Sequence, residues 1–348
     1  MDYRSAGVRW EKIRRPPWIQ FKAEPLFRAG MPESLVGAGG WGYFAGGLDA
    51  YARAFHFVEV NASFYRRIPD AMARRWRARV PADFVFSVKA HRDVTHADHL
   101  RASKAARESF SASVRTARIL RARFLILETA PFLAFDQPQL DGLRDLAAMV
   151  DGRTRIGLEA RAYRQGSLPA DLRRAMQREG ILDVVDLSQM NPRVADESVY
   201  TRLFGPGPHN VYEFDDDELR SIDRAGQDAV RAAFTFHGIR MYKDTARFLT
   251  FKRTGTFPSA TGQQGLASLT AVLRPDARFP TTKDDLVREH GWKVFDLNEQ
   301  RRAHARVLLA ALPDRTFRRL DEVVRELEYA PPRESTRRLQ PGPNSGPP

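Results

Sequence analysis

The 348-residue sequence contains no cysteine, so it has no disulfide bond, no thiolate nucleophile and no thiolate metal ligand. It has no apolar run close to the roughly 20 residues that span a membrane. Its first residues, MDYRSAGVRWEKIRRPPW, lack the apolar core of a signal peptide. We therefore expect a cytoplasmic protein without a membrane partner. The 43% hydrophobic and 28% charged residues are typical of a folded globular chain.

A glycine-rich phosphate loop is also missing after the first predicted strand. The segment GAGGWG at 37–42 is rich in glycine, but Trp41 stands where the backbone would have to approach a pyrophosphate. The sequence therefore predicts no nucleotide cofactor. The same mismatch disfavours a doubly wound open sheet, which is the competing fold.

Positive charge is abundant and concentrated. The formal net charge is +13, and residues 61–123 hold fifteen Lys or Arg against five Asp or Glu. A concentrated excess of one sign favours an anionic partner, here nucleic acid or another phosphorylated ligand. Two basic helices, predicted over 69–79 and 98–122, should be neighbours, and their predicted nucleic-acid-binding residues are Arg74, Arg77, Arg115 and Arg118. One alternative is a solvated helix face. Another is an arginine-rich surface that reflects a GC-rich genome or life at high salt or temperature.

Short apolar runs alternate with helical spacing along most of the chain. The runs lie at 34–40, 57–61, 84–90, 124–128, 155–160, 181–188, 198–205 and 229–238. Eight strands alternating with helices over roughly 200–250 residues predict a (β/α)8 TIM-type barrel. Only the connection from the sixth run to the seventh is too short for a full helix.

The two ends differ from the barrel in composition. Residues 1–34 are predicted to form a basic and aromatic extension, and residues 35–255 the barrel. Residues 256–330 are predicted to form a C-terminal loop and helical extension, with a helical pair over 299–328. The proline- and glycine-rich tail 331–348 should be disordered.

Polar side chains follow the predicted strands at the points where they end. In TIM-type barrels the active site lies at the carboxyl ends of the strands. Glu59 interrupts the apolar run FVEV, and a carboxylate there costs free energy unless it is paired or bound. The other residues at these ends include Trp41, Asn61, Tyr65, Lys89, His96, Glu128, Glu159, Arg161, Asp186, Arg202 and His237. Each residue alone is weak evidence, but their convergence on one face predicts a site.

The sequence resembles a known family in several blocks. GAGGWGYF, FVEVNASFYRRIP, FVFSVKAHRDVTH, GLEARAY, VYTRLFG and MYKDTARF are similar to the blocks of domain-of-unknown-function family 72, the YecE-like proteins. GWKVFDL at 291–297 is similar to a block of its archaeal-type branch. The resemblance implies a β/α barrel without an established activity. Its characteristic positions fall on Trp41, Glu59, Asn61, Phe64, Tyr65, Lys89, His96, Glu159, Arg161 and Arg202, whereas Glu128 and His237 depart from the family pattern.

Three kinds of function remain open for this set of residues. The first is metal-assisted phosphodiester cleavage, with Glu128, Glu159, Asp186 and His237 binding Mn²⁺, Mg²⁺ or Zn²⁺. The second is sugar isomerisation or epimerisation, with Glu59 or Glu159 as the base and Lys89 or His96 stabilising an enolate. The third is anion binding without chemistry, with Trp41, Asn61, Tyr65, Arg161 and Arg202 among the ligand-binding residues. A structural alternative is a closed ion-pair network of Glu59, Lys89, Glu159 and Arg161. The concentrated charge favours the nucleic-acid hypothesis.

Overall fold

The computed structural model describes residues 33–207 and 210–329. The predicted N-terminal extension, apart from its last two residues, and the predicted tail lie outside the described residues. The chain divides into two compact units, residues 1–259 and 260–348.

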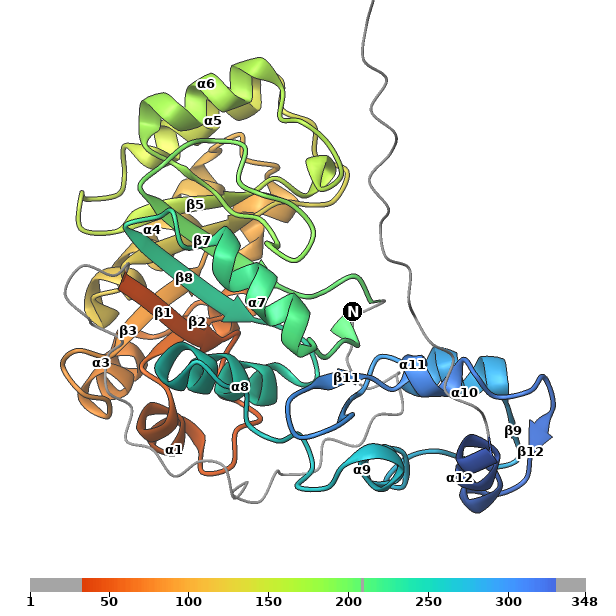
Figure 1. Ribbon diagram of the computed structural model, residues 1–348. Helices are drawn as coiled ribbons and strands as arrows, with labels where there is room; N and C mark the ends of the chain where they lie inside the picture. The colour runs from red at the N-terminus through yellow and green to blue at the C-terminus, as the bar shows by residue number, and fades with distance from the viewer. Residues whose placement is uncertain (1–32, 208–209, 330–348) are drawn as a thin grey trace, which may run out of the picture. The chain divides into compact units, whose positions relative to one another are not determined.

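Eight parallel strands form the first unit (Figure 1). The strands are β1 (Glu33–Ala38), β2 (Phe57–Val60), β3 (Val85–Lys89), β4 (Phe124–Glu128), β5 (Arg155–Glu159), β6 (Leu182–Asp183), β7 (Ser198–Leu203) and β8 (Arg231–Phe236). Their order is β6-β5-β4-β3-β2-β1-β8-β7. A single parallel bridge between Val185 and Thr201 joins the two ends of this order. The sheet is therefore a nearly closed barrel, which confirms the predicted TIM-type fold.

The strands are buried on both faces, as parallel strands covered by helices must be. All residues of β2, β3 and β4 are buried. Phe57, Phe124 and Tyr200 meet in the core cluster of the barrel, where Tyr200 lies 5.0 Å from Phe124 between ring centroids. This packing explains why the strands are apolar runs and lack the alternation of a half-exposed sheet.

Helices follow most of the strands. They are α1 (Gly47–Ala54), α2 (Ala62–Tyr65), α3 (Asp70–Ala78), the π-helix η1 (Asp93–Ala97), α4 (Lys104–Leu120), α5 (Gln137–Ala147), the 3-10 helix η2 (Arg161–Tyr163), α6 (Ala170–Glu179), α7 (Asp216–Ala225) and α8 (Met241–Thr254). No helix lies between β6 and β7, where every residue is described, as expected.

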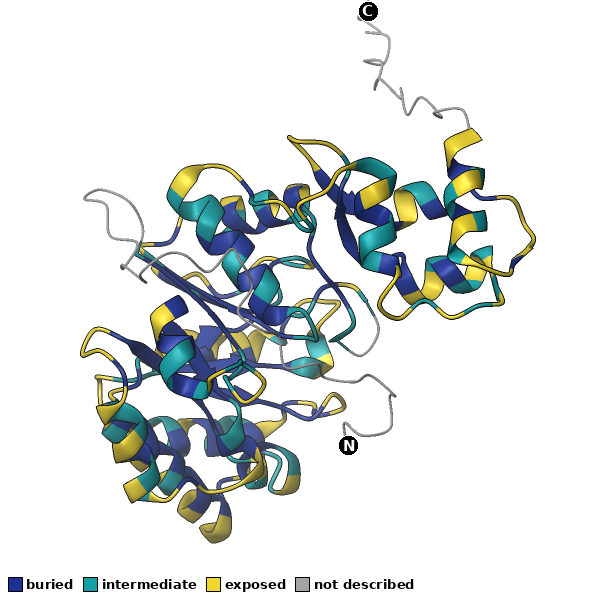
Figure 2. Ribbon diagram, turned by 90° about the horizontal axis from the view of Figure 1, so that it is seen from below, coloured by how far each residue is buried: buried dark blue, intermediate teal, exposed yellow. Residues whose placement is uncertain are grey.

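Helix α4 begins later than the predicted residue 98. His99, Leu100 and Ala102 have positive φ, so the chain cannot be helical there. The helix begins after Ser103, whose hydroxyl accepts a hydrogen bond from the Ala106 amide at 3.3 Å. The buried residues of α4 include Phe110 and face inward, and α3 packs beside it, as predicted. Figure 2 shows several helices that are dark blue on one side and yellow on the other, as expected where one face of a helix is buried.

The second unit has a hydrophobic core of its own, in which Leu286, Phe295 and Phe317 are almost fully buried. Its elements are α9 (Gly265–Leu273), β9 (Thr281–Thr282), α10 (Lys283–His290), β10 (Val294–Asp296), β11 (Arg302–His304), α11 (Arg306–Leu309), β12 (Thr316–Phe317) and α12 (Leu320–Tyr329). Strand β11 pairs with β10, and β12 pairs with β9, both antiparallel. Two helices, α11 and α12, lie within the helical pair predicted over 299–328, but the prediction was wrong for the residues of β11 and β12. Helical spacing within a segment does not reveal pairing with distant residues.

Among the described residues, no helix combines the length and the apolar character needed to span a membrane.

Candidate functional site

The carboxyl ends of the barrel strands bring eight polar side chains together. We call them the mouth cluster: Glu59, Lys89, Glu128, Glu159, Arg161, Arg164, Arg202 and His237. All of them except Arg161 and Arg164 are buried. Strands β2, β3, β4, β5 and β7 each contribute one member from within the strand, His237 directly follows β8, and Arg161 and Arg164 follow β5. The predicted convergence at one end of the barrel is therefore present.

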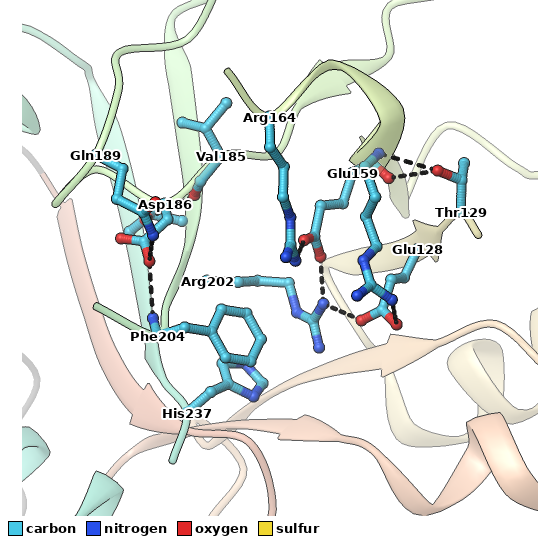
Figure 3. A network of polar contacts seen from close by, with 12 residues as sticks. Glu128, Thr129, Glu159, Arg164, Val185, Asp186, Gln189, Arg202, Phe204 and His237 are labelled. Atoms are coloured by element: carbon cyan, nitrogen blue, oxygen red, sulfur yellow. Dashed lines mark hydrogen bonds and ion pairs between the residues drawn. The ribbon is translucent and has the colours of Figure 1, made fainter. Parts of the chain in front are cut away.

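Arg202 lies at the centre of the mouth cluster (Figure 3). Its Nη1 contacts the Oε2 atoms of Glu128 and Glu159. Its Nη2 lies 3.2 Å from Oε1 of Glu59. Burial acts to lower the pKa of Arg202, but the three carboxylates hold this pKa well above its usual value. Arg202 is therefore a permanent cation that joins the ends of four strands.

Lys89 points into the barrel mouth. Its Nζ lies 2.8 Å from Oε2 of Glu128 and 3.9 Å from the ring centroid of Phe64. Burial lowers the pKa of Lys89, and the positive charge of Arg202 lowers it further. Burial would raise the pKa of Glu128, but Arg202 and Lys89 hold it below its usual range. The Glu128 carboxylate is therefore ionised at neutral pH.

Glu59 is the carboxylate that interrupts an apolar strand, and the structure shows how it is satisfied. The Tyr200 hydroxyl donates a hydrogen bond to Oε2 of Glu59 at 2.8 Å. The Ser87 hydroxyl lies 2.6 Å from the same tyrosine oxygen. Burial, followed by the charge of Glu59, raises the pKa of Tyr200 well above its usual value, so the hydroxyl remains a donor. Tyr200 and Arg202 together compensate the buried carboxylate.

His237 lies against Phe204, with ring centroids 4.7 Å apart and planes 22° apart. Burial lowers the pKa of His237 well below its usual value, and the charges of Arg202 and Lys89 add to this effect. His237 is therefore neutral at pH 7. A Cβ atom on Gly39 would lie 2.4 Å from its ring, so this position requires glycine.

Asn61 also lies against Gly39, and its Nδ2 donates to the Gly39 carbonyl at 3.1 Å. Its Oδ1 is buried without a hydrogen-bond partner among the described residues. A polar atom of this kind at the barrel mouth is suited to a ligand donor, since leaving it unpaired costs free energy.

Arg161 and Arg164 form the solvent side of the mouth cluster. The side chain of Arg161 is 25% exposed, and its Nη1 lies 3.3 Å from Oε1 of Glu128. Its Nε is buried without a hydrogen-bond partner among the described residues. Arg164 is 48% exposed and pairs with Oε1 of Glu159. The Arg161 amide donates to Thr129 Oγ1 at 3.0 Å, which fixes η2 over the mouth.

The other residues predicted around the mouth lie at its edge. His96 packs edge-on against Phe64 at 5.0 Å, and burial lowers its pKa. Trp41 packs against Trp76, with ring centroids 5.0 Å apart. Tyr65 is 57% exposed beside Phe64.

Asp186 has a different role from the one predicted for it as a metal ligand. Its Oδ2 accepts hydrogen bonds from the amides of Phe204 and Gly205 at 2.9 and 3.0 Å, which holds the loop after β7 (Figure 3). The oxygens of Glu128 and Glu159 that face the mouth contact Lys89, Arg161, Arg164 and Arg202. A divalent ion shared by the predicted ligands Glu128, Glu159, Asp186 and His237 would have to displace these cations. The metal site remains a prediction that this geometry does not favour.

Comparisons with known proteins agree with the fold. A family model described as "Protein of unknown function DUF72" matches residues 44–246. The chain belongs to the DUF72 family. The DUF72 match includes every residue of the mouth cluster, whereas the second unit lies outside it.

Two solved structures of DUF72 family proteins are similar to this chain. The protein from Enterococcus faecalis V583 is 14% identical with a TM-score of 0.53, over 65% of this chain and 99% of that one. The protein from Thermotoga maritima MSB8 is 16% identical with a TM-score of 0.51, over 63% of this chain and 99% of that one. At these identities the similarity shows the fold alone. No curated protein matches the chain.

The arginines predicted to bind nucleic acid differ in their surroundings. Arg77 donates to the Phe84 carbonyl at 2.7 Å and lies over the ring of Phe86, so it ties α3 to β3. Arg118 pairs with Asp151 at 3.3 Å, and Arg74 lies 3.8 Å from Asp70. Arg115 differs from these three arginines, because it lines an open hollow on the surface.

Sequence reasoning missed three residues of this DUF72 site: Arg164, Tyr200 and Phe204. Tyr200 stands two residues before Arg202, and residues i and i+2 of a strand face the same side. Arg164 stands three residues after Arg161, a spacing that places both on one side of a helical turn. These spacings were signals for Tyr200 and Arg164, whereas the stacking of Phe204 on His237 depends on loop conformation.

Proposed function

We propose that this DUF72 protein binds, at the barrel mouth, a ligand that carries a phosphate or carboxylate group. The observation behind the proposal is the charge of the mouth cluster. Lys89, Arg161, Arg164 and Arg202 are four cations, and Glu59, Glu128 and Glu159 are three carboxylates. His237 is neutral because its pKa is lowered. The cluster therefore carries one positive charge in excess, which an anionic ligand would compensate.

The arrangement of the cations supports the proposal. Lys89 and Arg202 are buried within the mouth, and Arg161 and Arg164 lie toward solvent. A planar guanidinium donates two parallel hydrogen bonds to phosphate or carboxylate oxygens. Arg161 has a suitable donor, since its buried Nε has no hydrogen-bond partner among the residues that the structure describes. The carboxylates fix the cations in place before a ligand arrives.

Calorimetric titration with inorganic phosphate and with a sugar phosphate at low ionic strength tests this function. Arg161→Gln should weaken binding about tenfold or more, since a hydrogen bond to a charged group contributes roughly 1.5–3 kcal/mol. Arg153→Gln is the matched control, because Arg153 is exposed before the amino end of β5, whereas Arg161 follows its carboxyl end. The proposal is wrong if the wild type shows no saturable binding, or if both variants weaken it equally.

A second candidate function is proton transfer on the bound ligand, as in sugar isomerisation. The lowered pKa of Lys89 favours it, because an amine that deprotonates more easily is a better acid–base group. NMR detection of exchange between a sugar-phosphate carbon and solvent deuterium would reveal this activity. We expect Lys89→Met to abolish it. Absence of exchange with aldose and ketose phosphates in the wild type would remove this candidate.

Metal-assisted phosphodiester cleavage has less support, because cations already contact Glu128 and Glu159. Elemental analysis of the purified protein tests it. If the wild type contains one equivalent of Mn²⁺, Mg²⁺ or Zn²⁺ and Glu128→Gln does not, metal-assisted cleavage would be favoured over anion binding without chemistry.

A further inference from the structure

Helix α4 lines a basic hollow on the outer surface of the barrel unit. The hollow has a volume of about 630 Å³ and is open to solvent. Its lining residues are Arg67, Lys104, Arg107, Glu108, Ser111, Ala112 and Arg115. The lining holds four cations and one carboxylate, and Asp145, which pairs with Arg107, lowers the excess to two positive charges. None of these residues belongs to the mouth cluster, so the hollow is a separate feature of the protein.

Two of the four cations are held in place by other residues. Arg67 Nη2 donates to Ser109 Oγ at 2.8 Å, and this hydroxyl donates to Asp93 at 3.1 Å. Arg107 Nε donates to the Ala102 carbonyl at 2.7 Å, and its Nη2 forms an ion pair with Asp145. Both guanidinium groups therefore have fixed positions at the hollow and lose little conformational entropy when they bind an anion.

The other two cations, Lys104 and Arg115, have no ion pair or side-chain hydrogen bond among the described residues, and both are exposed. They lie eleven residues apart on the same side of α4, a separation of roughly 16 Å at 1.5 Å per residue. A stacked nucleic-acid strand carries one phosphate per 3.4 Å, so this distance covers about four or five phosphates. Two partner-free cations at this separation fit a polyanion better than they fit a single small anion.

Exposed aromatic rings provide a second, independent observation. In the described part of the barrel unit, the large aromatic side chains that are exposed are Tyr43, Tyr65 and Phe132. Each follows the carboxyl end of a strand, β1, β2 and β4 respectively. Tyr65 stands only two residues before Arg67, which lines the hollow. Exposed aromatic rings combined with basic side chains bind unpaired bases by stacking.

We propose that the hollow along α4 and the ring of Tyr65 bind single-stranded nucleic acid. Lys104, Arg107 and Arg115 contact phosphates spread over about four or five nucleotides, and one base stacks on Tyr65. The single strand is favoured over the duplex because the bases of a duplex already stack on one another and offer no free face to Tyr65. This proposal does not depend on the ligand of the barrel mouth, since the two sites share no residue.

Fluorescence anisotropy with a labelled twenty-nucleotide dT oligomer tests the phosphate contacts. We expect affinity to fall with salt with a slope of about −0.7 in log K against log salt for each phosphate contacted. The double variant Lys104→Gln, Arg115→Gln should reduce the slope by about 1.4, the contribution of two phosphates. The control double variant Arg153→Gln, Arg224→Gln removes two exposed arginines outside the hollow and should leave the slope unchanged. Equal slopes in all three proteins would overturn the proposal.

The base contact has its own test. Tyr65→Ala should weaken dT binding about fivefold to a hundredfold, the usual contribution of stacking one base, whereas Tyr65→Phe should retain binding. Heparin, which is anionic but has no bases, should bind equally well to wild type and Tyr65→Ala. If Tyr65→Ala does not change the affinity for dT, or if a duplex of the same length binds more tightly than the single strand, the proposal is wrong. An acidic protein partner would then be the remaining explanation for the hollow.

Discussion

Arg202→Met should destabilise the barrel strongly at neutral pH. Arg202 contacts Glu59, Glu128 and Glu159, and it is 2% exposed. At an effective dielectric constant of about 20, one such contact at about 4 Å corresponds to roughly 4 kcal/mol. The gross loss is offset in part, because the variant no longer buries a guanidinium. Removal of one partner from a buried ion-pair network usually costs about 3–5 kcal/mol, and we expect a loss of this size.

The loss should depend on pH. In the wild type the folded pKa of Glu128 lies below its unfolded value of roughly 4.3, so its ion pairs stabilise the protein above that pH. This contribution is lost as pH falls through the folded pKa. In the variant, buried carboxylates without Arg202 protonate more readily. The variant therefore recovers stability as its buried carboxylates take up protons below pH 7. The difference in free energy of unfolding between the two proteins should shrink by about pH 4, before the wild-type contribution of Glu128 begins to be lost.

Denaturant unfolding followed by circular dichroism at several pH values measures both effects. Arg123→Met is the control, because its ion pair with Glu33 is partly exposed, and we expect a loss of about 1 kcal/mol or less. If Arg202→Met does not fold, Arg202→Lys retains the charge and should give a smaller loss with the same pH trend. A loss under about 1 kcal/mol at pH 7, or one equal at pH 4 and pH 7, would refute the central role of Arg202.

Three further predictions concern the neighbours of Arg202. As pH falls below about 6.5, His237 takes up a proton in the unfolded state but not in the folded state, so the free energy of unfolding should decrease. His237→Gln should reduce the slope of the free energy of unfolding against pH by up to about 1.4 kcal/mol per pH unit, as measured by denaturant unfolding of both proteins at the same pH values. Gly39→Ala should lower the free energy of unfolding by about 1–3 kcal/mol, because its Cβ would collide with His237. The control Gly152→Ala, whose Cβ would have no atom within 4 Å, should lower it little, and equal melting temperatures of the two variants would contradict this prediction. Tyr200→Phe should lower the free energy of unfolding by about 1–3 kcal/mol, because Oε2 of Glu59 loses the hydrogen bond from Tyr200. An unchanged midpoint of denaturant unfolding would show that this bond is unimportant.

The barrel could be predicted from the sequence because its signals are local and repeated. Each strand is an apolar run buried on both faces, and most of the runs are separated by segments with helical spacing. The second unit was less predictable, because β11 and β12 are two or three residues long and pair with β10 and β9. Pairing across the chain has no local signature, so helical spacing over 299–328 was misleading.

The mouth cluster was predictable in membership but not in connectivity. The position of Glu59, Lys89 and Glu128 at strand ends follows from the barrel itself. The sequence does not reveal that Arg202 would reach three carboxylates from β7, because that depends on which strands face each other across the barrel. Asp186 had the same signal as Glu159, yet it turns to the amides of Phe204 and Gly205. Strand-end position alone therefore does not separate ligands from loop supports.

Anion binding at the mouth is the central claim, and tungstate is a phosphate-like probe that is easily located. Anomalous diffraction from crystals grown with tungstate, in low salt, would test the claim most directly. We expect a peak at the barrel mouth within hydrogen-bond distance of Arg161, with Arg202 still in contact with Glu128 and Glu159. A mouth that stays empty at saturating tungstate, or a divalent metal between Glu128 and Glu159 with Arg202 displaced, would contradict it.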